Sequence, residues 1–206
     1  MIARLAGKFV SFQISAGIIK EGDYNIYQYG YTMLVEIALN LVVSVCLGIW
    51  LRQIKSIIFF FFIFLPLRSY CGGYHANKAW KCVLLSNAVA FGVVEAAKWG
   101  ALDPVPQWVK YLGAVSCSII ILCFSPADNE NRKLGERERK VYRTYATVVL
   151  VFEILLEHVL LFTGNIDFYY IVLLSHAVQA ISLICASVKR PVFDACCLAS
   201  NGKIEE

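Results

Sequence analysis

Six apolar tracts, each long enough or nearly long enough to cross a lipid bilayer, constrain this 206-residue chain more than any other feature. A hydrocarbon core of about 30 Å takes about 20 mostly apolar residues for each helical crossing. The composition agrees, because 59% of the residues are hydrophobic and only 17% are charged. The mean hydropathy is +0.63. The tracts are Tyr29–Leu51, Ile54–Leu67, Trp80–Trp99, Val109–Phe124, Val141–Phe162 and Phe168–Val188.

These tracts predict an all-α fold, a polytopic membrane helix bundle of six transmembrane helices in one domain over residues 1–206. The lysines and arginines predict its orientation. With the N-terminus in the cytoplasm, all but Arg52, Lys55, Lys98 and Lys110 of the 19 basic residues fall in inner segments. Basic residues concentrate on the cytoplasmic side, so we expect both termini and the polar segment 68–82 there.

Residues 1–28, ahead of the first tract, form an amphipathic N-terminal segment. No cleavable signal peptide is expected, because Met1–Lys20 alternates apolar, small and basic residues. Its apolar residues recur at roughly helical spacing, with Arg4 and Lys8 off that face; they are Ile2, Leu5, Phe9, Phe12 and Ile19. Two interpretations fit this pattern: a helix lying in the headgroup region, or a helix packed on the transmembrane bundle.

Ionisable residues within the tracts are costly at membrane depth and are expected to face the bundle interior or water. They are Glu36, Glu95, Glu153, Glu157, His158 and His176. Glu153 and Glu157 share a helix face, and His176 in the next tract is placed to pair with Glu153. Such residues either line a polar cavity for a peptide or form interhelical hydrogen bonds that fix packing or a dimer, and we favour the second interpretation.

The stretch "SYCGGYHANKAWKC", from Ser69 to Cys82, places a histidine between two thiols. A thiolate is a nucleophile, and a neighbouring imidazole takes its proton and later protonates a leaving amine. His75 has two possible partners, because Cys71 precedes it by four residues and Cys82 follows it by seven. On one continuous helix Cys71 would be its neighbour, whereas Cys82 would lie about 10.5 Å further along the axis. Spacing alone favours Cys71, and pairing with Cys82 requires a fold-back at Gly72-Gly73.

A second polar stretch, "SPADNENRKLGERERKVYR" over Ser125–Arg143, is rich in cations. We expect a loop that becomes helical after Gly135. Its basic residues either contact an acidic peptide or serve membrane topology and anionic lipids; they are Arg132, Lys133, Arg137, Arg139, Lys140 and Arg143. The eight cysteines lack the paired spacing of a structural zinc site, so no metal and no cofactor are predicted.

The sequence resembles the accessory gene regulator B (AgrB) family, membrane endopeptidases that process quorum-sensing propeptides in Gram-positive bacteria. The shared residues are Arg68, Gly72-Gly73, His75-Ala76 and Cys82, within "RSYCGGYHANKAWKC". Weaker matches are "SPADNENRKL" and "EGDYNIYQYG", and the resemblance covers essentially the whole chain. It implies a multi-pass protein of the bacterial cell membrane.

The resemblance also implies roles for the residues of this motif. Cys82 is the expected nucleophile and His75 its general base, which leaves Cys71 as a bystander. Arg68 and the backbone amides around Gly72 and Gly73 are candidates for stabilising the oxyanion. Candidates for orienting the histidine are Asn77, Asp128 and Asn129.

The implied substrate is a small, AgrD-like propeptide with an acidic C-terminal tail, cleaved through an acyl-thioester at the cytoplasmic face and cyclised. The other implied partners are membrane lipids and a second copy of the chain, and no nucleic acid is expected. The competing interpretations are a membrane peptide transporter and a non-catalytic scaffold. For His75 to reach Cys82, the helix that carries Cys82 must begin after His75, near Asn77 or Ala79, with Asn77 as its N-cap.

Overall fold

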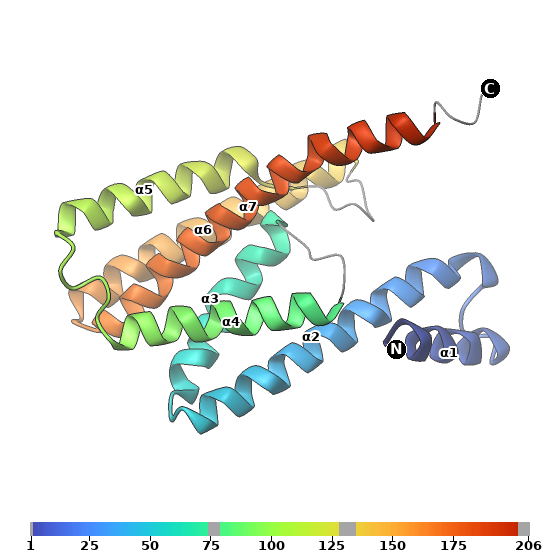
Figure 1. Cartoon of the computed structure of the whole chain (residues 1–206), viewed down its shortest axis with the longest axis horizontal. Coiled ribbons are helices and arrows are strands. Elements are labelled where there is room, and N and C mark those ends of the chain that lie inside the picture. The colour runs from blue at the N-terminus through green and yellow to red at the C-terminus, as the bar shows by residue number, and fades with distance from the viewer. Residues whose placement is uncertain (1, 74–78, 128–134, 202–206) are drawn as a thin grey trace.

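The computed structural model describes residues 2–73, 79–127 and 135–201. These residues form seven α-helices and one short 3-10 helix, without a strand (Figure 1), so the predicted all-α fold is confirmed. The elements are α1 (Ile2–Ser15), η1 (Glu21–Asp23), α2 (Tyr24–Trp50), α3 (Ile54–Cys71), α4 (Ala79–Lys98), α5 (Gln107–Phe124), α6 (Glu136–Phe162) and α7 (Ile166–Asn201).

Helices α2 to α7 run back and forth, so their ends gather on two sides of the bundle (Figure 1). We call one side the glycine end: it holds the end of α3 at Gly72-Gly73, the start of α4, the end of α5 and the start of α6. The opposite end holds the α2–α3, α4–α5 and α6–α7 connections. The basic residues predicted to be cytoplasmic, such as Arg68 and Lys140, therefore belong to one end, and Arg52 and Lys98 belong to the other.

Five segments within the described residues are long and apolar enough to cross a membrane: Glu21–Trp50, Ile54–Cys71, Gln107–Phe124, Glu136–Phe162 and Ile166–Val188. The remaining predicted tract is helical as α4, but this helix carries Lys81, Glu95 and Lys98 and is not among the five. The count of six spans and the orientation of the termini stay predictions. The bundle exposes many large apolar side chains, for example Leu112, Val115 and Ile119 on α5, as expected of a surface that faces lipid.

Helix α7 is central to the bundle, because it packs against α3, α4, α5 and α6. Tyr169, Ile171 and Leu183 on α7 are buried in two hydrophobic clusters, one nearer each end. Both clusters include side chains of α3, such as Phe60 and Leu67. The contact between α3 and α7 matters for the site, because the C-terminal end of α3 leads into the glycine pair.

The N-terminal helix α1 packs on α2 through the small side chains of Ala6 and Val10. This supports the interpretation of a helix packed on the bundle. Leu5, Phe9 and Phe12 of the predicted apolar face stay exposed, which suits a position beside lipid. Ile19 lies beyond the end of α1, so the prediction that it shares that face is wrong.

The polar side chains within the spans form specific contacts. His176 Nε2 lies 2.9 Å from Glu153 Oε2, and His176 Nδ1 lies 3.9 Å from Glu157 Oε2, with all three side chains buried. The predicted pairing of His176 with Glu153 is confirmed. His158 is exposed and stacks on the ring of Tyr111, so of its two expected surroundings the bundle interior does not apply to it.

Glu95 accepts hydrogen bonds from Gln53 and, at 2.8 Å, from Trp99 Nε1 near the opposite end. The side chain of Glu36 lies outside the described residues. The contacts of His176 and Glu95 link neighbouring elements, which supports the packing interpretation of the intramembrane polar residues.

Candidate functional site

The chain leaves α3 abruptly at the glycine pair. Helix α3 ends at Cys71, and Gly72 and Gly73 take φ angles of +71° and +138°, which L side chains rarely adopt. The one-turn helical relation between Cys71 and His75 is therefore wrong, because the helix does not continue between them. The next described helix, α4, begins at Ala79 as predicted, which places Cys82 in its first turn. His75 and the proposed Asn77 cap lie outside the described residues, as do Asp128 and Asn129.

Both glycines are surrounded so closely that a side chain does not fit. A Cβ atom on Gly73 would lie 1.8 Å from Arg68 Nη1 and 2.7 Å from Ser182 Oγ. A Cβ atom on Gly72 would lie 2.6 Å from the Ala127 carbonyl oxygen. These contacts demand glycine at both positions for steric reasons as well as for the φ angles.

Hydrogen bonds from distant parts of the chain hold this turn. The Gly72 carbonyl accepts hydrogen bonds from Arg68 Nη1 at 3.0 Å and from Gln179 Nε2 of α7 at 2.9 Å. Arg68 Nη1 also donates to Ser182 Oγ of α7 at 2.5 Å. The turn is therefore fixed both by its own helix and by α7. Sequence reasoning missed Gln179 and Ser182, because they lie more than 100 residues from the turn and in no motif.

The segment that leads toward the basic loop adds a further attachment. The backbone N–H of Ala127 donates to the Cys71 carbonyl at 2.9 Å. The two polar stretches singled out in the sequence thus meet at the glycine end.

The two thiols near the turn differ in accessibility. Cys71 is fully buried, with its sulfur beside the Ser125 hydroxyl. Cys82 is half-buried at the start of α4. The Arg68 guanidinium interacts electrostatically with both thiols, so Cys82 lies at the same end as the turn and near its cation. A substrate carbonyl can approach a half-buried thiol but not a fully buried one, which favours Cys82 as the nucleophile.

A polar contact with α2 sets the rotation of α4 five residues beyond Cys82. Ser44 Oγ donates to Asn87 Oδ1 at 2.6 Å, and Asn87 Nδ2 donates to Asn40 Oδ1 at 2.6 Å. Because side-chain bonds within an apolar bundle are specific in direction, this network holds the face of α4 that carries Cys82 in one orientation.

The basic start of α6 lies at the glycine end too. Helix α6 begins at Glu136, where the Glu138 carboxylate accepts the Gly135 N–H at 3.2 Å, so the predicted change from loop to helix is confirmed. Arg137, Lys140 and Arg143 are exposed there, Arg139 is half-buried, and Arg132 and Lys133 lie outside the described residues. The ring of Tyr70 on α3 packs on Tyr142 and Tyr145 of α6, at centroid distances of 6.1 and 5.2 Å. These rings join the basic segment to the helix that carries Arg68.

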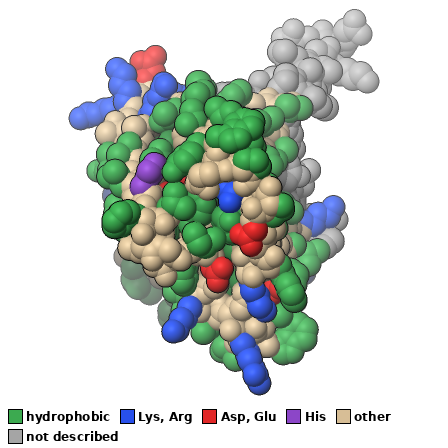
Figure 2. Space-filling view, turned by 90° about the vertical axis from the view of Figure 1, so that its left-hand side faces the viewer, with side chains coloured by type: hydrophobic (Ala, Val, Ile, Leu, Met, Phe, Trp, Pro, Cys, Tyr) green, Lys and Arg blue, Asp and Glu red, His purple; other side chains and the backbone are tan. Residues whose placement is uncertain are grey.

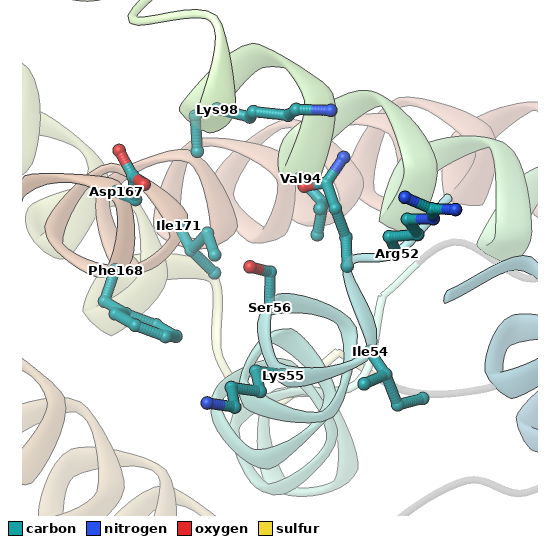
Figure 3. A pocket seen from close by; sticks show the side chains of 11 residues that line it. Arg52, Ile54, Lys55, Ser56, Val94, Lys98, Asp167, Phe168 and Ile171 are labelled. Carbon is teal, nitrogen blue, oxygen red and sulfur yellow. The ribbon is translucent and has the colours of Figure 1, made fainter. Parts of the chain in front are cut away.

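A pocket of about 440 Å³ lies at the opposite end, between α3, α4 and the start of α7 (Figure 3). Its lining includes the cations Arg52, Lys55 and Lys98 and the carboxylate of Asp167. None of the predicted site residues lines it. Figure 2 looks onto this end, where basic and acidic side chains are scattered among apolar ones.

A comparison with known protein families gave one match. The accessory gene regulator B family matches residues 5–183, which is most of the chain. A comparison with curated proteins and one with solved structures gave no match. The matched residues run from Leu5 within α1 to Leu183 within α7, and so span the glycine turn, Cys82 and the basic start of α6. The chain belongs to the accessory gene regulator B family, whose members take part in processing quorum-sensing propeptides.

Proposed function

We propose that this protein is a membrane-embedded cysteine endopeptidase that removes the C-terminal tail of an AgrD-like propeptide and promotes its cyclisation. Cys82 is the nucleophile and His75 the general base. The observation that carries the proposal is the half-buried Cys82 in the first turn of α4, close to a glycine turn that Arg68 and α7 hold rigidly. Rigid support of this kind is what a reacting group requires for a defined approach to its substrate.

In the first step, His75 takes the proton of the Cys82 thiol and the thiolate attacks the carbonyl carbon that joins the centre of the propeptide to its tail. A carbon–sulfur bond forms, the carbon–nitrogen bond breaks, and His75 returns the proton to the leaving amine. The products are the free acidic tail and an acyl-thioester on Cys82.

In the second step, a thiol within the bound propeptide attacks this thioester. A new carbon–sulfur bond closes the thiolactone while the bond to Cys82 breaks, and the proton of the peptide thiol passes to Cys82. One thioester replaces another, so the exchange needs no further energy source. A serine in place of the peptide thiol would give a lactone. Water has to be excluded from the thioester, which suits a position at the membrane boundary.

Two features bring positive charge near the Cys82 sulfur. The start of α4 presents the positive end of the helix dipole. The Arg68 guanidinium lies within electrostatic reach of the Cys82 sulfur. Positive charge near a cysteine sulfur favours its use as a nucleophile.

The two backbone amides of the glycine turn differ in whether they are available to stabilise an oxyanion. The Gly72 N–H already donates to the Arg68 carbonyl at 3.0 Å, so it is not free to bind an oxyanion. Among the described residues no hydrogen bond occupies the Gly73 N–H. We therefore assign the oxyanion contact to the Gly73 amide and give Arg68 two parts, holding the turn and supplying positive charge.

The acidic tail of the substrate fits the basic start of α6. Arg137, Lys140 and Arg143 are exposed at the glycine end, and Arg132 and Lys133 precede them in the sequence. Opposite charges steer and dock a flexible tail without a preformed pocket. The homodimer, the contacts with lipid and the cytoplasmic position of the site remain predictions.

The test compares three cysteines in cells that make a matching propeptide. Cys82→Ala is expected to abolish tail release, while Cys71→Ala and the control Cys46→Ala retain it, with all three proteins present in the membrane. A covalent adduct between the wild-type protein and the propeptide, labile to hydroxylamine and lost in Cys82→Ala, would identify the thioester. Cleavage by Cys82→Ala would contradict the endopeptidase and revive the transporter or the scaffold.

A further inference from the structure

The pocket at the opposite end gathers positive charge from three elements. Arg52 lies in the α2–α3 connection, Lys55 at the start of α3 and Lys98 at the end of α4. Asp167 is the one carboxylate among the residues that line this space. The three cations lie on different sides of it, with the Ser56 hydroxyl between them (Figure 3). The pocket therefore carries a net positive charge and suits an anion.

The cations of the pocket have no ion-pair partner within the described residues. The ion pairs found there belong to His176, and none involves Arg52, Lys55 or Lys98. The Lys98 ammonium lies 5.8 Å from the centroid of the Trp99 ring, a contact that leaves its charge in place. Charges of one sign around one space repel each other, and a bound anion relieves that repulsion.

The wall that carries Arg52 is held in place by hydrogen bonds. The Gln53 N–H donates to the Gly48 carbonyl at 2.8 Å, and Gln53 Nε2 donates to the Glu95 carboxylate of α4. Arg52 itself has a φ angle of +56°, a conformation that costs any residue other than glycine some free energy. The connection between α2 and α3 is thus fixed against α4, with the guanidinium at the pocket.

The start of α3 adds uncharged donors to the same wall. Within the described residues no backbone hydrogen bond occupies the N–H groups of Lys55 and Ser56. The Gln53 side chain does not cap this helix. A helix start with free N–H groups is a favourable place for phosphate oxygens, and here it lies among three cations.

The position of the pocket indicates which anion it takes. Trp50, Trp99 and Trp108 are exposed at this end of the bundle, and tryptophan is enriched where the bilayer meets water. Apolar side chains, among them Phe168 and Ile171, line the pocket together with the cations. A phospholipid presents a phosphate directly beside hydrocarbon at this level, whereas a soluble anion has no apolar part for such a lining.

We propose that this pocket binds the phosphodiester headgroup of an anionic phospholipid. Arg52, Lys55 and Lys98 neutralise the phosphate, the N–H groups at the start of α3 donate to its oxygens, and the apolar lining receives the beginning of the acyl chains. A volume of about 440 Å³ is within the usual range for a small-ligand site. The inference does not depend on the proposed endopeptidase, because the site lies at the end opposite Cys82.

Native mass spectrometry of the full chain in neutral detergent tests the proposal. Dioleoylphosphatidylglycerol is titrated against dioleoylphosphatidylcholine, which has the same acyl chains but no net charge. We expect the first phosphatidylglycerol to bind about ten- to thirtyfold more weakly to Arg52→Gln/Lys98→Gln than to the wild type. The control Lys8→Gln/Lys20→Gln removes two exposed cations that do not line the pocket, and it should bind this lipid as the wild type does.

Thermal unfolding in the same detergent gives a second readout. A ligand of the folded state raises the unfolding midpoint, so phosphatidylglycerol should raise it in the wild type and the control and much less in Arg52→Gln/Lys98→Gln. Equal affinity for the two lipids, or equal weakening in both double variants, would overturn the proposal.

Soluble competitors identify the source of the anion. Inorganic phosphate or glycerol 1-phosphate at the concentration of the lipid should not displace it, because neither contacts the apolar lining. Displacement by either would assign the pocket to a soluble phosphate compound and overturn the lipid. Displacement by a hexaglutamate peptide would overturn it as well, and would indicate that this end binds an acidic peptide.

Discussion

Both ends of the bundle contain a glycine with a positive φ angle, but the surroundings of the two glycines differ. Gly73 at the glycine end and Gly164 at the opposite end both have positive φ angles, +138° and +75°. A Cβ atom on Gly164 would meet nothing within 4 Å, whereas one on Gly73 would overlap Arg68 and Ser182. Gly164 serves a connection between two helices, and Gly73 serves a turn that other elements hold in place.

Polar contacts at the two ends differ in the same way. At the opposite end Lys110 donates to Tyr170 Oη at 2.9 Å, and Tyr170 Oη donates to Asp103 at 2.7 Å, so side chains tie α5 and the α4–α5 connection to α7. At the glycine end Arg68 and Gln179 bond to a backbone carbonyl instead. Side-chain bonds between elements stabilise the bundle, whereas bonds to a turn fix the path of the chain toward His75. Crowding around a glycine therefore distinguishes a turn that other elements hold in place from a plain connection between two helices.

The distinction between the two ends requires that they face opposite sides of the membrane, and labelling of introduced cysteines tests this. Single cysteines introduced by Lys140→Cys and Asp103→Cys, in a background without the exposed native cysteines, mark exposed positions at the two ends. With both termini in the cytoplasm, an impermeant maleimide applied to intact cells should label only the second.

Permeabilised cells provide the control, because both positions should then react. Labelling of the Lys140 position in intact cells would invert the topology and place the site outside. Labelling of both positions would contradict a bundle with two sides.

Substitutions of Gly73 and Gly164 test whether activity depends on the crowding around a glycine or only on its positive φ angle. Gly73→Val places atoms where Arg68 and Ser182 lie, and we expect cleavage to fall at least about a hundredfold, because the turn and its hydrogen bonds must move. Gly164→Val imposes a comparable backbone cost in open space and should leave kcat nearly unchanged. Rates of tail release, normalised to protein in the membrane, measure both. Equal losses in the two variants would remove the distinction between the ends.

Sequence reasoning captured the features that are local in the chain. Tract length and hydropathy predicted the helices, because a span buries a continuous run of apolar residues. The requirement that His75 reach Cys82 predicted a break after Cys71 and a new helix near Ala79, because helix geometry fixes distances over a few residues. The pairing of His176 with Glu153 followed from the cost of isolated charge within a membrane.

The features that the sequence did not reveal are contacts between distant segments. Gln179 and Ser182 lie on an ordinary apolar helix, and only the packing of α7 on α3 brings them to the turn. Asn40 and Ser44 likewise have a recognisable role only because they form hydrogen bonds with Asn87 on another helix. No periodicity or spacing encodes such a contact, because it depends on the crossing of two helices. For the same reason the sequence left open whether His158 faces the interior or water, since helical phase alone does not identify the neighbour of each face.

Substitutions of two histidines test whether the buried polar cluster between the two ends stabilises the bundle. His176 is buried against Glu153, whereas His158 is exposed and stacks on Tyr111. His176→Leu leaves two buried carboxylates without their partner, and we expect a loss of about 2 kcal/mol in the free energy of unfolding. His158→Leu should change it by less than about 0.5 kcal/mol. Thermal unfolding in detergent measures both, and equal midpoints would show that the buried cluster does not stabilise the bundle.

The smallest expected effect concerns the charges at the two ends. Exposed Arg137 and Lys140 begin α6 at the glycine end, and Lys55 and Lys98 line the pocket at the opposite end. Replacing the first pair by glutamine is expected to raise KM for the propeptide about three- to tenfold without changing kcat, because exposed charges attract the acidic tail but do not touch the scissile bond. The matched replacement of Lys55 and Lys98 should leave KM unchanged. The difference should shrink in about 0.5 M salt, where screening acts over a few ångströms. An equal rise in KM for both pairs would mean that net charge rather than position recruits the substrate. It would contradict binding of the acidic tail at the glycine end.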